Sequence, residues 1–229
     1  YSRAAERGDA AAQARLGEMY EHGVGLCQDY GEALGWYRRA AEQGDATGQA
    51  LLGSMYARGL GVPVDYQEAG KWSRLAAAQG NAKAQYNLAV IYSEGCGETR
   101  DDQEAIKWFR LAAEQDWPGA LYALGYIYYW GSGVPRDKEE AVKWFRKAAG
   151  QGDAEGQCAL GWMYKEGEGV AQDYKEAIKW FRKAADQGCS NAQVDLGTMY
   201  EKGYGVTQDF KEALKLYRQA AGQGNSLAM

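Results

Sequence analysis

Few residues of this chain carry side chains that do acid–base or nucleophilic chemistry. His22 is the single histidine, and the cysteines are Cys27, Cys96, Cys158 and Cys189. Such chemistry needs a nucleophile and a base within hydrogen-bonding reach of each other. The sequence contains no metal-ligand spacing and no glycine-rich phosphate loop. It therefore favours a protein that is not an enzyme and needs no cofactor or metal, with His22 as a solvated residue at a helix end.

Aromatic side chains offer a different chemistry, which is recognition by contact. Tyr122, Tyr126, Tyr129 and Trp130 lie close together in the sequence. Tyrosine and tryptophan supply a large contact area with few rotatable bonds and a polar tip, and they are enriched where proteins bind partners. These four residues are the first candidates for a binding site, provided that one element presents them together.

That element comes from a repeat of 36 residues. A Leu recurs at this interval, with a Tyr four residues after each one: Leu16, Leu52, Leu88, Leu124, Leu160 and Leu196. Apolar residues three and four apart share one face of a helix, so each repeat opens with a helix, called helix A. A Gly-x-Gly pair such as Gly23 and Gly25 follows it, and glycine tolerates the left-handed conformation that ends a helix.

A second helix, called helix B, completes each repeat. It starts at an Asp with a Glu three residues later, as in Asp173 and Glu176, which is the spacing of a capping box. Large and small apolar residues then alternate at helical spacing. In helix A a Gly follows five of the six Leu residues, as at Gly17, and we expect a neighbouring helix to pack closely there.

The sequence thus predicts an all-α chain of six complete helix-turn-helix repeats with a half repeat at each end. The repeats cover approximately residues 8–43, 44–79, 80–115, 116–151, 152–187 and 188–223. Residues 1–7 match the end of a helix B, and residues 225–229 match the start of a helix A. We expect a single domain over residues 1–229 that is a fragment of a longer protein.

The net charge of the chain limits which kinds of partner it can bind. The chain has 26 basic and 31 acidic residues and a net charge of −5, the wrong sign for binding a nucleic-acid backbone. No apolar run approaches the ~20 residues that a membrane span requires, so we expect no direct membrane insertion. One column of helix B holds an arginine in all six repeats, and we interpret it as structural ion pairs: Arg38, Arg74, Arg110, Arg146, Arg182 and Arg218.

The cysteines occupy different positions in the repeat, and only Cys158 and Cys189 lie in adjacent repeats. Five positions along a helix are about 7 Å of rise, and the lateral step between helices adds about 8 Å. Because this separation exceeds disulfide reach, we expect four free thiols. Free thiols leave the compartment undetermined.

The repeat resembles the Sel-like (Sel-one) repeat family, a relative of the tetratricopeptide repeats. The fifth repeat matches it through Leu160, Gly161, Met163, Tyr164, Gly167, Gly169, Val170, Asp173, Tyr174, Glu176, Ala177, Lys179, Trp180, Phe181, Arg182, Lys183, Ala184 and Ala185. The resemblance implies a right-handed α/α solenoid, or superhelix, with the A helices on its concave side. It also implies protein–protein recognition and, in bacteria, periplasmic, secreted or host-contact settings. The paired cysteines of the family's disulfide-rich branch, and the residues for the hydrolytic activity linked with it, are missing.

Five positions of helix A vary among the six repeats, at −5, −2, +2, +5 and +6 from the recurring Leu. They form one face of the helix, called the variable stripe below, which the resemblance places in the concave groove. In the first two repeats the stripe is small or polar, whereas the fourth carries the aromatic residues named above. Two interpretations stay open, a recognition site or aromatic filling of a tightly curved groove. Trp117, just before this helix, is interpreted as covering the helix end.

We therefore predict a scaffold or adaptor that binds a peptide or protein segment in the groove. The alternative is a glycan-binding or peptidoglycan-binding module of the cell envelope that uses the same aromatic residues. The predicted partner-binding residues are Tyr86, Val90, Tyr122, Tyr126, Tyr129, Trp130, Trp162, Arg58, Glu94, Lys165 and Glu166.

Overall fold

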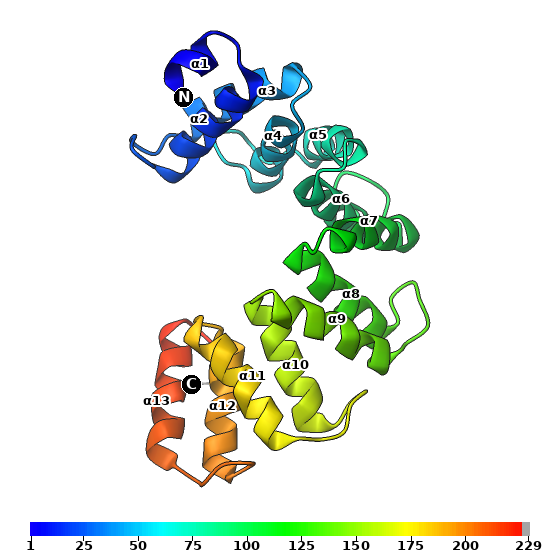
Figure 1. Ribbon diagram of the computed structural model, residues 1–229, viewed down its shortest axis with the longest axis vertical. Coiled ribbons are helices and arrows are strands. Elements are labelled where there is room, and N and C mark those ends of the chain that lie inside the picture. The colour runs from blue at the N-terminus through cyan, green and yellow to red at the C-terminus, as the bar shows by residue number, and fades with distance from the viewer. Residues whose placement is uncertain (226–229) are drawn as a thin grey trace. The chain divides into compact units, whose positions relative to one another are not determined.

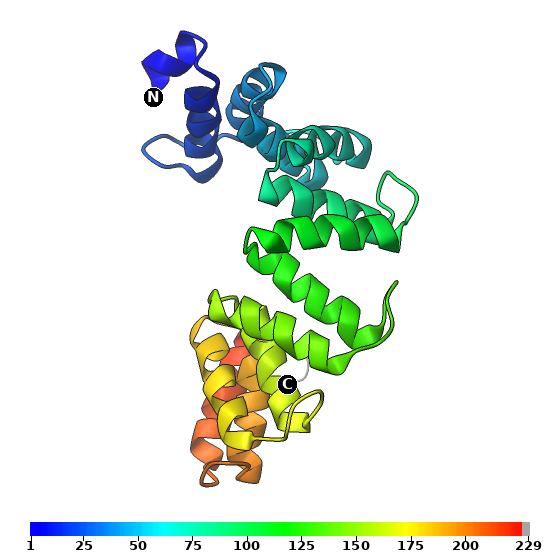
Figure 2. The ribbon, with the colours of Figure 1, turned by 45° about the vertical axis from the view of Figure 1, so that its right-hand side comes forward.

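The computed structural model describes residues 1–225, which form helices joined by short turns, with no strand in that range (Figures 1 and 2). The helices are α1 (Ser2–Glu6), α2 (Ala10–His22), α3 (Tyr30–Glu42), α4 (Ala46–Arg58), α5 (Tyr66–Ala78), α6 (Ala82–Glu94), α7 (Asp102–Glu114), α8 (Pro118–Trp130), α9 (Lys138–Gly150), α10 (Ala154–Glu166), α11 (Tyr174–Asp186), α12 (Ser190–Lys202) and α13 (Phe210–Gly222). The predicted all-α fold of six helix-turn-helix repeats is confirmed. The predicted start of a further helix A at 225–229 lies outside the described residues, except for Asn225.

The chain divides into two compact units, Tyr1–Trp117 and Pro118–Met229. Within each unit, helix A packs on the helix B of its own repeat, and helix B packs on the next helix A. The A helices of neighbouring repeats also touch, as α2 touches α4 and α8 touches α10. The prediction of a single domain stays a prediction.

The helix ends follow from local hydrogen bonds. Asp45 precedes α4 and accepts a hydrogen bond from the backbone N–H of Gly48 at 2.6 Å, which satisfies one of the free donors at a helix start. Helix α4 then ends at Gly59, whose φ of 66° is left-handed. Helix α8 begins at Pro118, which suits the first turn because proline lacks the N–H that would be unpaired there.

The predicted capping box forms only in part. Asp173 accepts hydrogen bonds from the backbone N–H groups of Lys175 and Glu176. The N–H of Asp173, which a capping-box Glu would bind, donates instead to the Tyr164 carbonyl at 2.9 Å. Glu176 pairs with Lys179. Helix A and helix B are therefore joined by a backbone hydrogen bond at this turn, and the same bond recurs in the other five repeats.

The prediction of close packing at the helix A glycine is confirmed. A Cβ atom on Gly125 would lie 2.5 Å from Cδ1 of Phe145 on α9, and one on Gly161 would lie 2.8 Å from Cδ1 of Phe181 on α11. Both distances are too short for real contacts, so an aromatic ring of helix B occupies the space that any larger residue would need.

The prediction of ion pairs along the arginine column was largely wrong. Arg38 donates to the Tyr56 hydroxyl at 2.7 Å, and Arg182 donates to the Tyr200 hydroxyl. Arg74 and Arg146 also contact the tyrosine of the next helix A, and Arg74 adds an ion pair with Glu98 at 2.6 Å. The guanidinium reaches the next repeat because that tyrosine lies 18 residues later on the packed neighbour. The column is structural, but its main acceptor is a phenol.

Buried glutamines form a second set of contacts between repeats. Gln49 of α4 is buried, donates to the Ala41 carbonyl of the preceding helix B, and accepts from Gln79 at 2.8 Å. Equivalent pairs join Gln43 to Gln13, Gln115 to Gln85, Gln187 to Gln157 and Gln223 to Gln193. In the fourth repeat Leu121 takes the place of the helix A glutamine.

Candidate functional site

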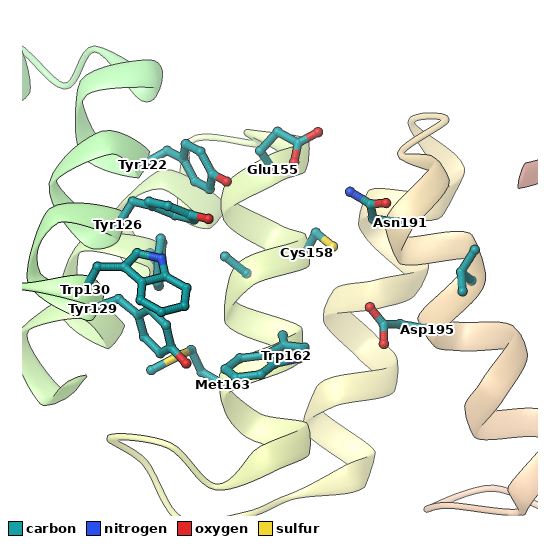
Figure 3. Close-up of a pocket in the computed structure, with 13 residues that line it drawn as sticks. Tyr122, Tyr126, Tyr129, Trp130, Glu155, Cys158, Trp162, Met163, Asn191 and Asp195 are labelled. Atoms are coloured by element: carbon teal, nitrogen blue, oxygen red, sulfur yellow. The ribbon is translucent and has the colours of Figure 1, made fainter. Parts of the chain in front are cut away.

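A cavity of about 500 Å³ opens in the second unit between α8, α9, α10 and α12. Helix α8 contributes an aromatic wall, and α10 and α12 contribute the facing polar and aliphatic side chains (Figure 3). We call this cavity the aromatic pocket. Its volume lies within the range of about 300–1,000 Å³ that ligand sites occupy.

The aromatic wall follows from helical spacing. Tyr122, Tyr126, Tyr129 and Trp130 are separated by three or four residues or adjoin, so α8 projects them to one side (Figure 3). The ring centroids of Tyr122 and Tyr126 lie 6.0 Å apart, and those of Tyr126 and Trp130 lie 6.1 Å apart. Tyr129 meets Trp130 edge to face at 5.0 Å and Trp162 of α10 at 5.7 Å. The rings form one continuous surface.

The aromatic residues of the wall differ in how far they are exposed. Tyr122 is half-buried and packs on Phe145 with ring centroids 5.8 Å apart. Tyr129 is also half-buried, between the two tryptophans. By contrast, the side chains of Tyr126 and Trp130 are 51% and 56% exposed. Tyr122 and Tyr129 thus fill space, whereas Tyr126 and Trp130 present open faces.

The opposite side of the aromatic pocket is acidic. Glu155 and Asn191 are exposed at its edge, and Asp195 lies deeper, where it pairs with Lys165 at 2.9 Å. Lys165 also contacts Glu166 at 3.3 Å. Burial opposes the charge of Lys165, but hydrogen bonds to Asp195 and Glu166 raise its pKa. The basic residue is therefore held by two carboxylates.

The charge of the pocket also acts on the aromatic wall. Burial raises the pKa of Tyr122 to about 12, and the negative charge of Glu155 adds to that increase. A phenol resists ionisation when it is desolvated and close to a carboxylate. The carboxylate of Glu155 therefore acts on the Tyr122 phenol across the pocket.

Four predicted site residues lie in the first unit and do not line this pocket. Arg58 pairs with Glu21 at 3.2 Å, and Glu94 accepts a hydrogen bond from the Cys96 thiol at 3.7 Å. Val90 is half-buried on α6. Tyr86 packs near Phe109 and Trp117, with ring centroids 5.8 and 6.3 Å apart. The interpretation of Trp117 as a cover for a helix end stays a prediction.

Lys165 and Glu166 lie beside the pocket through their ion pairs. The sequence prediction missed the lining residues Phe145, Glu155, Cys158, Ala159, Met163, Asn191, Val194 and Asp195. Four of these, Glu155, Cys158, Asn191 and Val194, occupy the −5 and −2 positions of the variable stripe, so the signal was present in the repeats that follow the aromatic one. The others lie outside the stripe.

The prediction that Cys158 and Cys189 are far apart was wrong. The Cys189 thiol donates to Oε1 of Glu155 on α10 at 3.8 Å, and it is close enough to Cys158 to raise the pKa of that thiol. Cys189 precedes α12 at the N-cap position, so its side chain reaches across to α10 and the predicted helix rise does not apply. The pKa of Cys158 is raised by the hydrogen bond with Cys189 and by burial. All four cysteines are free thiols, and His22 is exposed at the end of α2.

No helix within residues 1–225 is both long and apolar enough to cross a membrane. A comparison with functionally curated proteins returns no match.

Solved structures share the fold. A protective antigen of uropathogenic Escherichia coli is 43% identical with a TM-score of 0.85; the match covers 99% of this chain and 49% of the antigen. This chain therefore spans about half of that protein. A Sel1 repeat protein from Oxalobacter formigenes is 37% identical with a TM-score of 0.89, over 94% of this chain and 89% of that one. An immunity protein from Pseudomonas aeruginosa is 21% identical with a TM-score of 0.62, over 96% of this chain and 84% of its own, and shows the fold alone.

The family profile of the Sel1 repeat matches six consecutive segments, at residues 10–45, 46–81, 82–117, 118–153, 154–189 and 190–225. Each segment holds one helix A, one helix B and the turns between them. The predicted boundaries differ by two residues, because they were placed in the turn before each helix A. The chain belongs to the Sel1 repeat family.

Proposed function

We propose that this chain binds a segment of a partner protein at the aromatic pocket. Sel1 repeat proteins are generally protein-interaction scaffolds. One observation carries the choice of place: Tyr126 and Trp130 are more than half exposed on the wall of a preformed cavity. Exposed aromatic side chains gathered beside a cavity are typical of the residues that dominate binding energy at protein interfaces.

The other lining groups suit a peptide. Asn191 offers an amide that can pair with a backbone N–H and a carbonyl, and the tyrosine hydroxyls donate and accept hydrogen bonds. Tyr122 and Tyr129 are held by Phe145 and Trp162. Because these rings are already packed, little side-chain freedom is lost when a ligand binds.

Selection from a displayed peptide library on the purified chain tests the proposal. Affinities of the selected peptides are then measured for the wild type and for Tyr126→Ala combined with Trp130→Ala. We expect the double variant to lose at least about tenfold in affinity, since aromatic residues of this kind carry much of the binding energy. Its thermal midpoint should change by less than about 3 °C, because both side chains are largely exposed.

The matched control is Tyr66→Ala combined with Phe210→Ala, which removes two exposed aromatic residues that do not line the pocket. It should bind the selected peptides as the wild type does. Equal affinity of the pocket variant and the wild type would overturn the proposal. The same variants on a glycan array test the alternative: pocket-dependent binding of glycans, with no pocket-dependent peptide, would replace the peptide with a sugar ligand.

A further inference from the structure

The tryptophans of this protein differ in whether the chain itself supplies them with a cation. Each tryptophan of a helix B has a cationic side chain close to its ring. The distances to the ring centroid are 4.4 Å for Arg39 and Trp36, 4.5 Å for Lys147 and Trp144, and 4.3 Å for Lys183 and Trp180. Lys71 and Lys107 lie 5.3 and 5.6 Å from the two remaining rings. A cation over an aromatic face is attracted by the ring's quadrupole.

In the aromatic pocket this arrangement stops at Tyr129. Arg136 and Lys138 approach the Tyr129 ring at 5.4 and 5.8 Å. Within residues 1–225, no cation lies over the ring of Tyr126 or Trp130. The two most exposed rings of the pocket therefore have no cation of the chain over their faces.

The charged residues that line the pocket are Glu155 and Asp195, and both are acidic. Lys165 neutralises Asp195. Among the described residues, Glu155 forms no ion pair, and it accepts a hydrogen bond from the Cys189 thiol at 3.8 Å. Figure 3 shows Glu155 at the same end of the pocket as Tyr122. A carboxylate without an ion-pair partner thus lines the same pocket as the open rings of Tyr126 and Trp130.

We infer that the pocket binds an arginine side chain of the partner segment, stacked on Tyr126 and Trp130 with its guanidinium directed to Glu155. This inference rests on the proposed function and gives its chemical specificity. Arginine fits better than lysine because the planar guanidinium stacks on aromatic faces and binds a carboxylate through two parallel hydrogen bonds. An acidic partner side chain would meet the unneutralised carboxylate of Glu155 and is disfavoured by charge.

The experiment uses two small probes, Nα-acetyl-arginine amide and Nα-acetyl-citrulline amide, which differ in charge and little in shape. Binding is followed by NMR at the Trp130 indole N–H, whose resonance is assigned by its absence in Trp130→Phe. We expect the arginine probe to bind at least about tenfold more tightly than the citrulline probe, since a charge-assisted pair adds to stacking. Raised salt should weaken the arginine probe, because salt screens the exposed carboxylate.

Glu155→Gln should weaken the arginine probe about fivefold to tenfold and leave the citrulline probe unchanged. The control is Glu139→Gln, which removes the same charge from an exposed position of α9 that does not line the pocket. It should bind both probes as the wild type does. Equal binding of the two probes, or no effect of Glu155→Gln on the arginine probe, would overturn the inference.

The selected peptides separate this failure from failure of the proposed function. Suppose that the peptides bind the Tyr126 and Trp130 double variant more weakly, but bind the wild type equally well when their arginines are replaced by citrulline. The pocket then binds peptides but does not recognise an arginine, and only the inference is wrong. If the peptides bind the double variant as tightly as the wild type, the proposed function itself is wrong.

Discussion

The first and fourth repeats have the same framework but opposite contents. In the first, Glu21 of α2 is buried and accepts a hydrogen bond from the Tyr37 hydroxyl of α3 at 2.7 Å. The equivalent residues 108 positions later are Tyr129 and Phe145. A hydrogen-bonded pair of phenol and carboxylate in one repeat thus becomes a pair of aromatic rings in the other.

The sixth repeat resembles the first, since the Tyr217 hydroxyl donates to Glu201 at 2.8 Å. The fourth repeat also replaces the buried helix A glutamine by Leu121. Its helix A therefore lacks two polar contacts that the first repeat makes, although Leu121 is itself fully buried. The comparison teaches that the variable stripe is not uniformly free: in some repeats its side chains complete the fold, and in the fourth they form an open surface.

The largest expected effect tests what the two repeats share. Gly17→Ala would place a Cβ atom 2.6 Å from Cδ1 of Tyr37, and Gly125→Ala would place one 2.5 Å from Cδ1 of Phe145. We expect each to lower the free energy of unfolding by about 1–3 kcal/mol through overpacking. Urea denaturation followed by circular dichroism measures the loss. Gly150→Ala, which meets no atom within 4 Å, is the control and should be neutral or stabilising by up to about 1 kcal/mol. Equal stability of all three variants would contradict the shared close packing.

A smaller effect comes from exchanging the pairs that differ. Phe145→Tyr puts a hydroxyl into the fourth repeat, where no carboxylate occupies the position equivalent to Glu21. We expect the free energy of unfolding to fall by about 1–2 kcal/mol because the hydroxyl is buried and unpaired. Adding Tyr129→Glu recreates the pair of the first repeat and should recover part of that loss. A double-mutant cycle by urea denaturation measures the coupling. If Tyr129→Glu only lowers the free energy of unfolding further, the phenol–carboxylate pair does not explain the difference between the two repeats.

The smallest effect concerns protonation at the aromatic pocket. The pKa of Tyr122 is raised to about 12, first by burial and then by the charge of Glu155. Because the folded-state pKa is raised, this tyrosine stabilises the fold below its ordinary pKa of about 10, and the contribution is lost as the pH rises through about 12. Glu155→Gln should lower the pKa of Tyr122, as measured by NMR of ¹³Cζ-labelled tyrosine, whereas Glu139→Gln should not. An unchanged pKa of Tyr122 in Glu155→Gln would show that the Glu155 charge does not act on this phenol.

The sequence predicted the helices because their signals are local. Asp45 and Gly59 mark the two ends of α4 within a few residues of the bonds they make, and the spacing of Leu and Tyr defines the buried face. The aromatic wall was predictable for the same reason, since Tyr122, Tyr126 and Trp130 lie one turn apart on a single helix.

The polar contacts between helices were not predictable in this way. Glu21 occupies the +5 position of the variable stripe, yet it is buried because its partners come from two other helices, Tyr37 of α3 and Arg58 of α4. Gln49 recurs at a fixed position, but a glutamine alone gives no sign that it is buried. Cys189 precedes its helix, so helical spacing does not predict where its side chain points. In each case the missing information was which side chain lies opposite.

The glutamine pairs have a consequence for how such an array can change in length. Each helix A glutamine that forms a pair bonds both to its own repeat's helix B glutamine and to a backbone carbonyl of the preceding repeat. Inserting or deleting one residue would turn the helix by about 100° and leave a buried amide without partners, at a cost of about 1–3 kcal/mol. Duplication or loss of whole 36-residue units would leave each glutamine beside its partners, so the pairs favour changes of length by whole repeats. The fourth repeat, with Leu121, has no such amide to leave unpaired.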